Sequence, residues 1–117
     1  MSAYTQEQTA FFFDVMALGT WLEDQGYEPA FGEAWRPQWV AEVYAAQGKG
    51  SKVSLHIDRM AVDIVIRKDG KEVGAADYKR CGEAWKAIDP KNCWGGDFKG
   101  KTAGDFQHFS RGYGGRK

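Results

Sequence analysis

The stretch SLHIDRMAVDI, residues 54–64, places His56 and Asp63 seven positions apart among apolar side chains. Apolar and polar residues alternate over residues 53–57 (VSLHI), which is typical of a half-buried strand with His56 on its polar face. Residues 61–67 (AVDIVIR) predict a second strand, in which Asp63 lies on the face opposite to the isoleucines. A turn at IDRM would bring the faces of His56 and Asp63 together across a hairpin.

Helical patterns precede this stretch. We expect a first helix over residues 5–25, because a capping-box pattern opens at Thr5 and Gly26 can end the helix. A connector, YEPAFGEAWR, follows the first helix. Pro37 can then open a second helix that runs to about Gln47.

The remaining segments predict a hairpin, a third helix and short extended pieces. The Asp69-Gly70 pair is a hairpin signal that leads into a third strand. The third helix stops before Pro90 and carries apolar residues at helical spacing, namely Tyr78, Cys81, Trp85 and Ile88. We expect a loop at GKGSK (residues 48–52) and extended pieces at CWGGDF (93–98) and DFQHF (105–109). The fold class is therefore α+β, with a small, mostly antiparallel sheet and N-terminal and flanking helices.

Length and charge limit the function classes. The 117 residues suit a single domain spanning 1–117. Sixteen basic residues balance sixteen acidic ones, so we expect no nucleic-acid partner and no attraction to anionic membranes. The apolar run FFFDVMALGTWL is too short to span a bilayer and contains Asp14, so we expect no membrane insertion. The N-terminus carries no secretory signal, and we expect the protein to stay in the cytoplasm until another factor releases it.

The two cysteines do not form a zinc motif. Cys81 and Cys93 are twelve positions apart, unlike the close pairs of structural zinc sites. We expect two reduced, mostly buried thiols. A disulfide stays open as an alternative if the protein leaves the cytoplasm.

Both histidines of the chain have an acid close by in the sequence. Asp63 follows His56, and Asp105 precedes His108. Two imidazoles and a carboxylate are a sufficient zinc set that leaves a fourth position open. Asp105 and His108 are three positions apart, so a turn or bulge must interrupt the strand if they act together. The alternative is a packed aromatic-edge histidine at position 108 and a turn acid at position 63.

Three motifs resemble a known superfamily of zinc peptidases. Ser54, His56, Ala61 and Asp63 are in register with the S-x-H-x-x-x-x-A-x-D signature of the D-alanyl-D-alanine-type enzymes that cut peptidoglycan stems. WGGDF followed by DFQHF resembles the second signature, and AWRPQW resembles the element that precedes the histidine motif. The resemblance covers residues 33–109 and implies a hedgehog-type peptidase fold. The motif spacings are close to those of compact bacteriophage L-alanyl-D-glutamate endopeptidases.

Two positions depart from the wider superfamily. Arg59 stands where many members have glycine, although phage-type sequences often carry a basic residue there. Asp105 stands where the dipeptidase branch has glutamate, which favours the endopeptidase branch.

The resemblance implies a role for each motif residue. His56, Asp63 and His108 would be the zinc ligands, and Asp105 would be the general base. Arg36 would bind substrate or stabilise negative charge on the reacting carbonyl, since its planar fork suits either task. Ser54 is expected to hydrogen-bond near the site and Glu33 to be structural. Trp94, Gly95 and Gly96 are expected to shape the cleft wall.

The implied function is hydrolysis of a peptide bond in the peptidoglycan stem, as a phage or prophage endolysin with Zn²⁺ as cofactor. A D-Ala-D-Ala carboxypeptidase of the same fold and a non-catalytic, metal-containing wall-binding phage module stay open as alternatives. We expect a monomer whose partner is the stem peptide. Its expected location is the host cytoplasm until release to the periplasm and cell wall, and carriage on the virion stays open.

Overall fold

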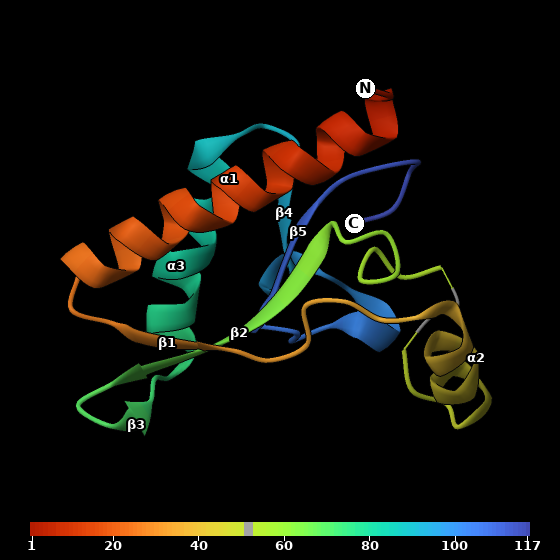
Figure 1. Ribbon diagram of the computed structural model, residues 1–117. Helices are drawn as coiled ribbons and strands as arrows, with labels where there is room; N and C mark the ends of the chain where they lie inside the picture. Colours follow the sequence, from red (N-terminus) through yellow and green to blue (C-terminus); the bar gives the residue numbers. More distant parts are fainter. Residues whose placement is uncertain (51–52) are drawn as a thin grey trace.

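The computed structural model describes residues 1–50 and 53–117. Its helices are α1 (Ala3–Asp24), α2 (Gln38–Ala46) and α3 (Ala75–Ile88). Its strands are β1 (Glu28–Phe31), β2 (Ala61–Lys68), β3 (Lys71–Glu72), β4 (Asn92–Trp94) and β5 (His108–Arg111). Two short 3₁₀ turns, η1 (Gly95–Asp97) and η2 (Gly100–Thr102), follow β4. The α+β fold class is confirmed (Figure 1).

The strands form a sheet in the order β1-β2-β5-β4, and β3 pairs with β2. The pairings within the described residues are antiparallel. Helices α1 and α3 lie together on one side of the sheet, whereas α2 stands apart from the sheet (Figure 1). The central pair, β2 and β5, brings residues 61–63 opposite residues 108–110.

The hydrophobic core lies between the sheet and the two helices α1 and α3. Alternate residues of β2 point into it, as the sequence predicts, while Asp63 lies on the other face. The indole of Trp85 sits at the centre, and its Nε1 donates hydrogen bonds to the carbonyls of Cys93 and Ser110. The fully or nearly buried core residues include Leu18, Leu22, Val62, Ile64, Ile66, Tyr78, Cys81, Trp85, Trp94 and Phe109.

The strand expected over residues 53–57 does not form, and this prediction was wrong. The segment is a succession of turns, in which the amides of Ile57 and Asp58 bond back to the carbonyls of Ser54 and Leu55. Leu55 is buried while Val53 is exposed, so the alternation does not mark two faces of a sheet. The loop expected over residues 48–52 includes residues 51 and 52, which lie outside the described residues.

Other boundaries differ at the ends of elements. Helix α1 begins earlier than expected, because the Ser2 hydroxyl accepts a hydrogen bond from the Thr5 amide and caps the helix. The segment expected to be a connector contains the edge strand β1. The expected Asp-Gly hairpin is present, with φ of 53° at Asp69 and 78° at Gly70. In the DFQHF segment only the last two residues belong to β5.

Both cysteines are free thiols, with Cys81 buried in the core. No helix within the described residues is long and apolar enough to cross a bilayer.

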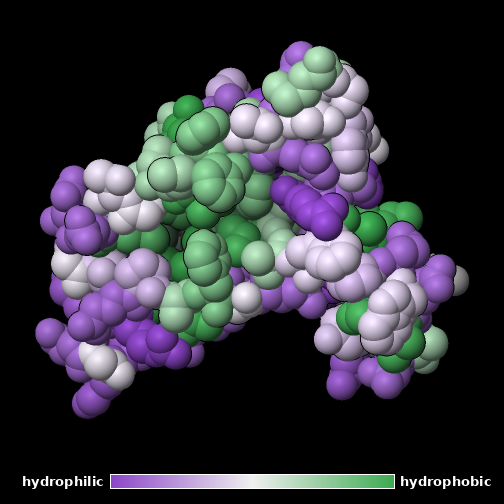
Figure 2. Space-filling view, in the orientation of Figure 1, coloured by the Kyte–Doolittle hydropathy of each residue, from purple (hydrophilic) through white to green (hydrophobic). Residues whose placement is uncertain are grey.

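Apolar side chains also line a shallow groove of about 150 Å³ between α1 and β1, and they gather on the face seen in Figure 2. Phe12, Met16 and Phe31 are exposed on these two elements.

A buried arginine ties β5 to α1 and to the end of α3. The side chain of Arg111 is 7% exposed, and its Nε donates a hydrogen bond to Glu7. Its Nη1 lies 3.5 Å from Asp14 and 3.2 Å from Asp89. Hydrogen bonds from Arg111 and then Lys91 hold the pKa of Glu7 below its usual range. The Lys91 backbone amide, followed by Arg111, lowers the pKa of Asp89.

We expect Arg111→Met to unfold more easily, by about 3 kcal/mol at pH 7, because it removes a buried guanidinium from between partly buried carboxylates. Since the folded-state pKa values of Glu7 and Asp89 are lowered, their stabilisation is present above about pH 4 and is lost as pH falls through the lowered values. Urea unfolding at pH 7 and pH 3 measures both effects. The difference between wild type and variant should shrink in acid.

The exposed Arg67→Met is the matched control, with an expected change within about 0.5 kcal/mol. An Arg111→Met penalty of equal size at both pH values would show that packing of the side chain, and not its charge, ties β5 to α1.

Candidate metal centre

Two of the expected ligands face each other across the central strand pair. Asp63 of β2 is the register partner of His108 of β5, so both side chains lie on the sheet face that is not packed by α1 and α3. His108 is 5% exposed, while Asp63 is half-buried. The backbone register alone therefore brings a carboxylate and an imidazole together.

His56, the third expected ligand, lies in the turns formed by residues 54–60. Leu55 and Met60 are buried in a small cluster with Ala61, which anchors the segment on both sides of His56. The amide of His56 donates to the Ser54 hydroxyl at 3.2 Å, as expected of a hydrogen-bonding group near the site. Arg59 has φ of 59°, in the left-handed region of backbone conformation that favours glycine. The Arg59 guanidinium lies 4.3 Å from the centre of the Trp35 ring.

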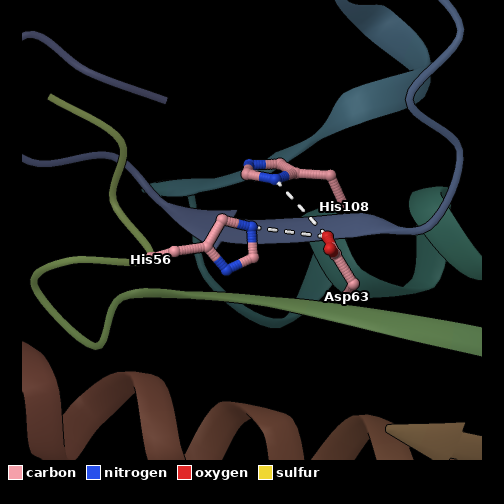
Figure 3. A group of neighbouring side chains, drawn as sticks. All are labelled: His56, Asp63 and His108. Atoms are coloured by element: carbon pink, nitrogen blue, oxygen red, sulfur yellow. Dashed lines mark ion pairs between the residues drawn. The ribbon is translucent and has the colours of Figure 1, made fainter. Parts of the chain in front are cut away.

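The three side chains converge on one point (Figure 3). Asp63 Oδ1 lies 3.4 Å from His56 Nε2 and 3.9 Å from His108 Nδ1. One ligand atom from each residue lies within 4.8 Å of the other two. Tetrahedral zinc with bonds of about 2.0–2.1 Å holds its ligand atoms about 3.3 Å apart, so small movements would complete such a site.

The surroundings of His108 favour the neutral form of its imidazole, which is the form that binds a metal. Burial, followed by the neighbouring His56, lowers the pKa of His108 to about 4. The His108 ring is therefore neutral near pH 7 and offers a lone pair. The two ring nitrogens that point away from the cluster, His56 Nδ1 and His108 Nε2, are buried without a hydrogen-bond partner among the described residues.

The cluster opens on a cleft of about 1030 Å³. Arg36 and Asp105 line this cleft together with the three cluster residues. Asp105 lies in the turn before β5, and its Oδ2 is 3.8 Å from His108 Nδ1, so the required interruption of the strand is present. Burial, followed by the Asp63 carboxylate, raises the pKa of Asp105. The structure thus brings all five expected site residues to one cleft.

Residues 32–36, which follow β1, lie against the backbone of Asp63 and His56. This contact was not predicted from the sequence. The Gly32 amide donates to the Asp63 carbonyl at 2.7 Å, and the Asp63 amide donates to the Glu33 carbonyl at 2.8 Å. Further along, the Arg36 amide donates to the His56 carbonyl at 3.1 Å. A Cβ atom at Gly32 would lie 3.1 Å from Asp63 Cβ, so the chain approaches Asp63 closely here. The spacing of Glu33 and Arg36, three residues apart, was the available sequence signal.

Trp94, Gly95 and Gly96, which were expected to shape the cleft wall, pack beneath or beside the loop that carries Asp105. Trp94 Nε1 donates a hydrogen bond to the Phe106 carbonyl at 2.9 Å. A Cβ atom at Gly95 would lie 2.1 Å from the Asp105 carbonyl oxygen and 2.8 Å from His108 Cβ. Gly96 packs against the Trp94 indole in the same way. These residues therefore position Asp105 and His108.

The fold matches that of a solved endopeptidase. The chain superposes on the L-Ala D-Glu endopeptidase ChiX of Serratia marcescens with a TM-score of 0.57 and 22% identity. The match covers 72% of this chain and 66% of ChiX, so the chain spans just under two thirds of the length of that protein. No family model matches the sequence, and no curated protein is significantly similar to it. The fold expected from the peptidase resemblance is confirmed.

We expect Gly95→Ala to be less stable than wild type by about 1–3 kcal/mol, because the added methyl group meets the backbone of Asp105 and not a flexible side chain. The His108 imidazole resonances should shift in the same variant. Urea unfolding and NMR of the histidine rings measure the two effects.

Gly19→Ala is the matched control, since a Cβ atom at Gly19 in α1 has no neighbour within 4 Å. It should be as stable as wild type or more stable, by up to about 1 kcal/mol. Wild-type stability and unshifted His108 resonances in Gly95→Ala would mean that Gly95 does not position the loop.

Proposed function

We propose that this protein is a zinc metallopeptidase that hydrolyses a peptide bond in the peptidoglycan stem, of the L-alanyl-D-glutamate endopeptidase type. The observation that carries the proposal is the cluster of His56, Asp63 and His108 at the floor of an open cleft. The fold shared with the L-Ala D-Glu endopeptidase ChiX supports the choice of reaction.

The residues present fit a catalytic zinc ion. Two imidazoles and one carboxylate are a typical set for such a site, whereas structural zinc is usually enclosed by four protein ligands. His56 Nε2, Asp63 Oδ1 and His108 Nδ1 are the atoms that would hold the ion. Zinc bound there would supply Lewis-acid activation of a water molecule and of the scissile carbonyl.

Asp105 is the general base in this proposal. Its half-exposed carboxylate lies beside the cluster and reaches the cleft, where an attacking water can approach. It takes a proton from that water and passes it to the leaving amine. The raised pKa of Asp105 makes it a stronger proton acceptor than an ordinary aspartate.

Arg36 is the proposed substrate-binding cation. Its side chain is 11% exposed, lies in the cleft and is held by Glu33, with its Nε donating at 2.8 Å. A planar guanidinium can bind a substrate carboxylate or stabilise the negative charge that develops on the reacting carbonyl. Lys99, Lys101 and Lys117 also line the cleft, which suits a stem peptide that carries free carboxylates.

The proposed biological role is that of a phage or prophage endolysin. It rests on the resemblance of the three motifs and their spacing to compact phage endopeptidases. In this role the enzyme would remain in the host cytoplasm until its release to the cell wall, where it would act as a monomer on the stem peptide.

Digestion of purified peptidoglycan tests the reaction. New amino termini at D-glutamate are the expected product. Release of terminal D-alanine would instead identify a carboxypeptidase, and the absence of any cleavage by zinc-loaded protein would favour a wall-binding module.

We expect Asp105→Asn to retain zinc and to lose turnover by about a hundredfold to ten-thousandfold, because the amide cannot accept the proton. His56→Ala and His108→Ala should instead lose the metal itself. Elemental analysis and the digestion assay on the same preparations separate the two effects.

Asp24→Asn is the control, since Asp24 is exposed at the end of α1 and is not among the described residues that line the cleft, and it should leave turnover near the wild-type value. A fully active Asp105→Asn protein would assign the base to another residue, and full zinc content in either histidine variant would refute the ligand set.

A further inference from the structure

Glu33 lies between a proposed metal ligand and the proposed substrate-binding arginine. Its Oε1 accepts a hydrogen bond from Arg36 Nε at 2.8 Å and lies 3.7 Å from His56 Nδ1. The His56 side chain is 4% exposed, and Nδ1 has no hydrogen-bond partner among the described residues. Glu33 is thus the carboxylate that faces the outer nitrogen of this buried ring.

The chemistry of a metal-bound imidazole makes this contact important. The nitrogen that binds the metal must be free of a proton, so the other ring nitrogen carries an N–H. His56 Nε2 points to Asp63 in the cluster, which leaves Nδ1 as the site of that N–H. A buried N–H without an acceptor is destabilising, so an acceptor at this position favours the tautomer that binds metal.

We propose that Glu33 is a positioning residue that accepts the Nδ1 proton of His56 and so fixes the ring for metal binding. The inference rests on the proposed zinc site and assigns Glu33 more than the structural role expected from the sequence. A movement of about 0.8 Å would bring the present separation to hydrogen-bond length.

The surroundings hold Glu33 where this role requires it. Its backbone carbonyl accepts a hydrogen bond from the amide of Asp63, so Glu33 is fixed to one proposed ligand while its side chain faces another, His56. Arg36 holds the Oε1 atom of Glu33 and is itself fixed by its backbone amide, which donates a hydrogen bond to the His56 carbonyl. Glu33 therefore needs only a small side-chain rotation to reach His56, without movement of the chain.

Zinc affinity measured by chelator competition tests the role of Glu33 independently of turnover. Glu33→Gln keeps an acceptor without the charge and should bind zinc about tenfold more weakly, and Glu33→Ala should approach a hundredfold loss. The exposed Glu42→Gln on α2 removes the same charge away from the cluster and should leave the affinity unchanged.

The ¹⁵N NMR spectrum of the histidine rings supplies a second measurement. The chain has two histidines, so the spectrum of the zinc-loaded protein is simple to assign. We expect a protonated Nδ1 on His56 in wild type and a shifted or exchange-broadened Nδ1 signal in Glu33→Gln. If Glu33→Ala fails to fold, Glu33→Gln decides through both readouts.

The outcomes separate this inference from the proposed function. If the wild-type protein binds zinc and both Glu33 variants bind it equally well, the proposed role of Glu33 is refuted and the proposed metallopeptidase function still stands. Wild-type protein that binds no zinc would overturn both.

Discussion

The register between β2 and β5 is the constraint on which the candidate site depends. Asp63 pairs with His108 in this register, and Val62 pairs with Phe109 on the opposite face. A slip of β2 by one residue against β5 would turn Val62 away from the core and would move Asp63 into it. The apolar contacts of the core face therefore enforce the placement of the polar pair on the cleft face.

The remaining site residues are held by segments that attach to this strand pair. The segment from Gly32 to Arg36 bonds to the backbone of both Asp63 and His56. On the other side, Trp94 and Gly95 support the loop that carries Asp105. The floor of the cleft is thus built from backbone hydrogen bonds and close packing. Metal binding to such a preformed cluster would add its binding free energy to the stability of the fold.

Local patterns were sufficient to predict much of the fold. The alternation in residues 61–67, the Asp69-Gly70 turn and the third helix all follow from neighbouring residues, and each is present. The alternation of apolar and polar residues over 53–57 led to the wrong prediction of a strand. A strand also needs a partner strand, and none pairs with this segment in the described part of the chain. Strand β1 was missed because it is short and contains Pro29, which a sheet tolerates at an edge. The cluster of His56, Asp63 and His108 was predicted from the resemblance of three motifs to the zinc peptidases, because the spacing of the histidines and acids alone left it open. The contact of Glu33 with His56 depends on how distant segments pack.

The identity of the metal ligands is the central claim, and X-ray absorption at the zinc edge of the zinc-loaded protein measures it most directly. The predicted spectrum shows a four-coordinate ion with two imidazole nitrogens and oxygen ligands, all at about 2.0–2.1 Å. A sulfur ligand at about 2.3 Å would place the metal at Cys81 or Cys93 and would contradict the account.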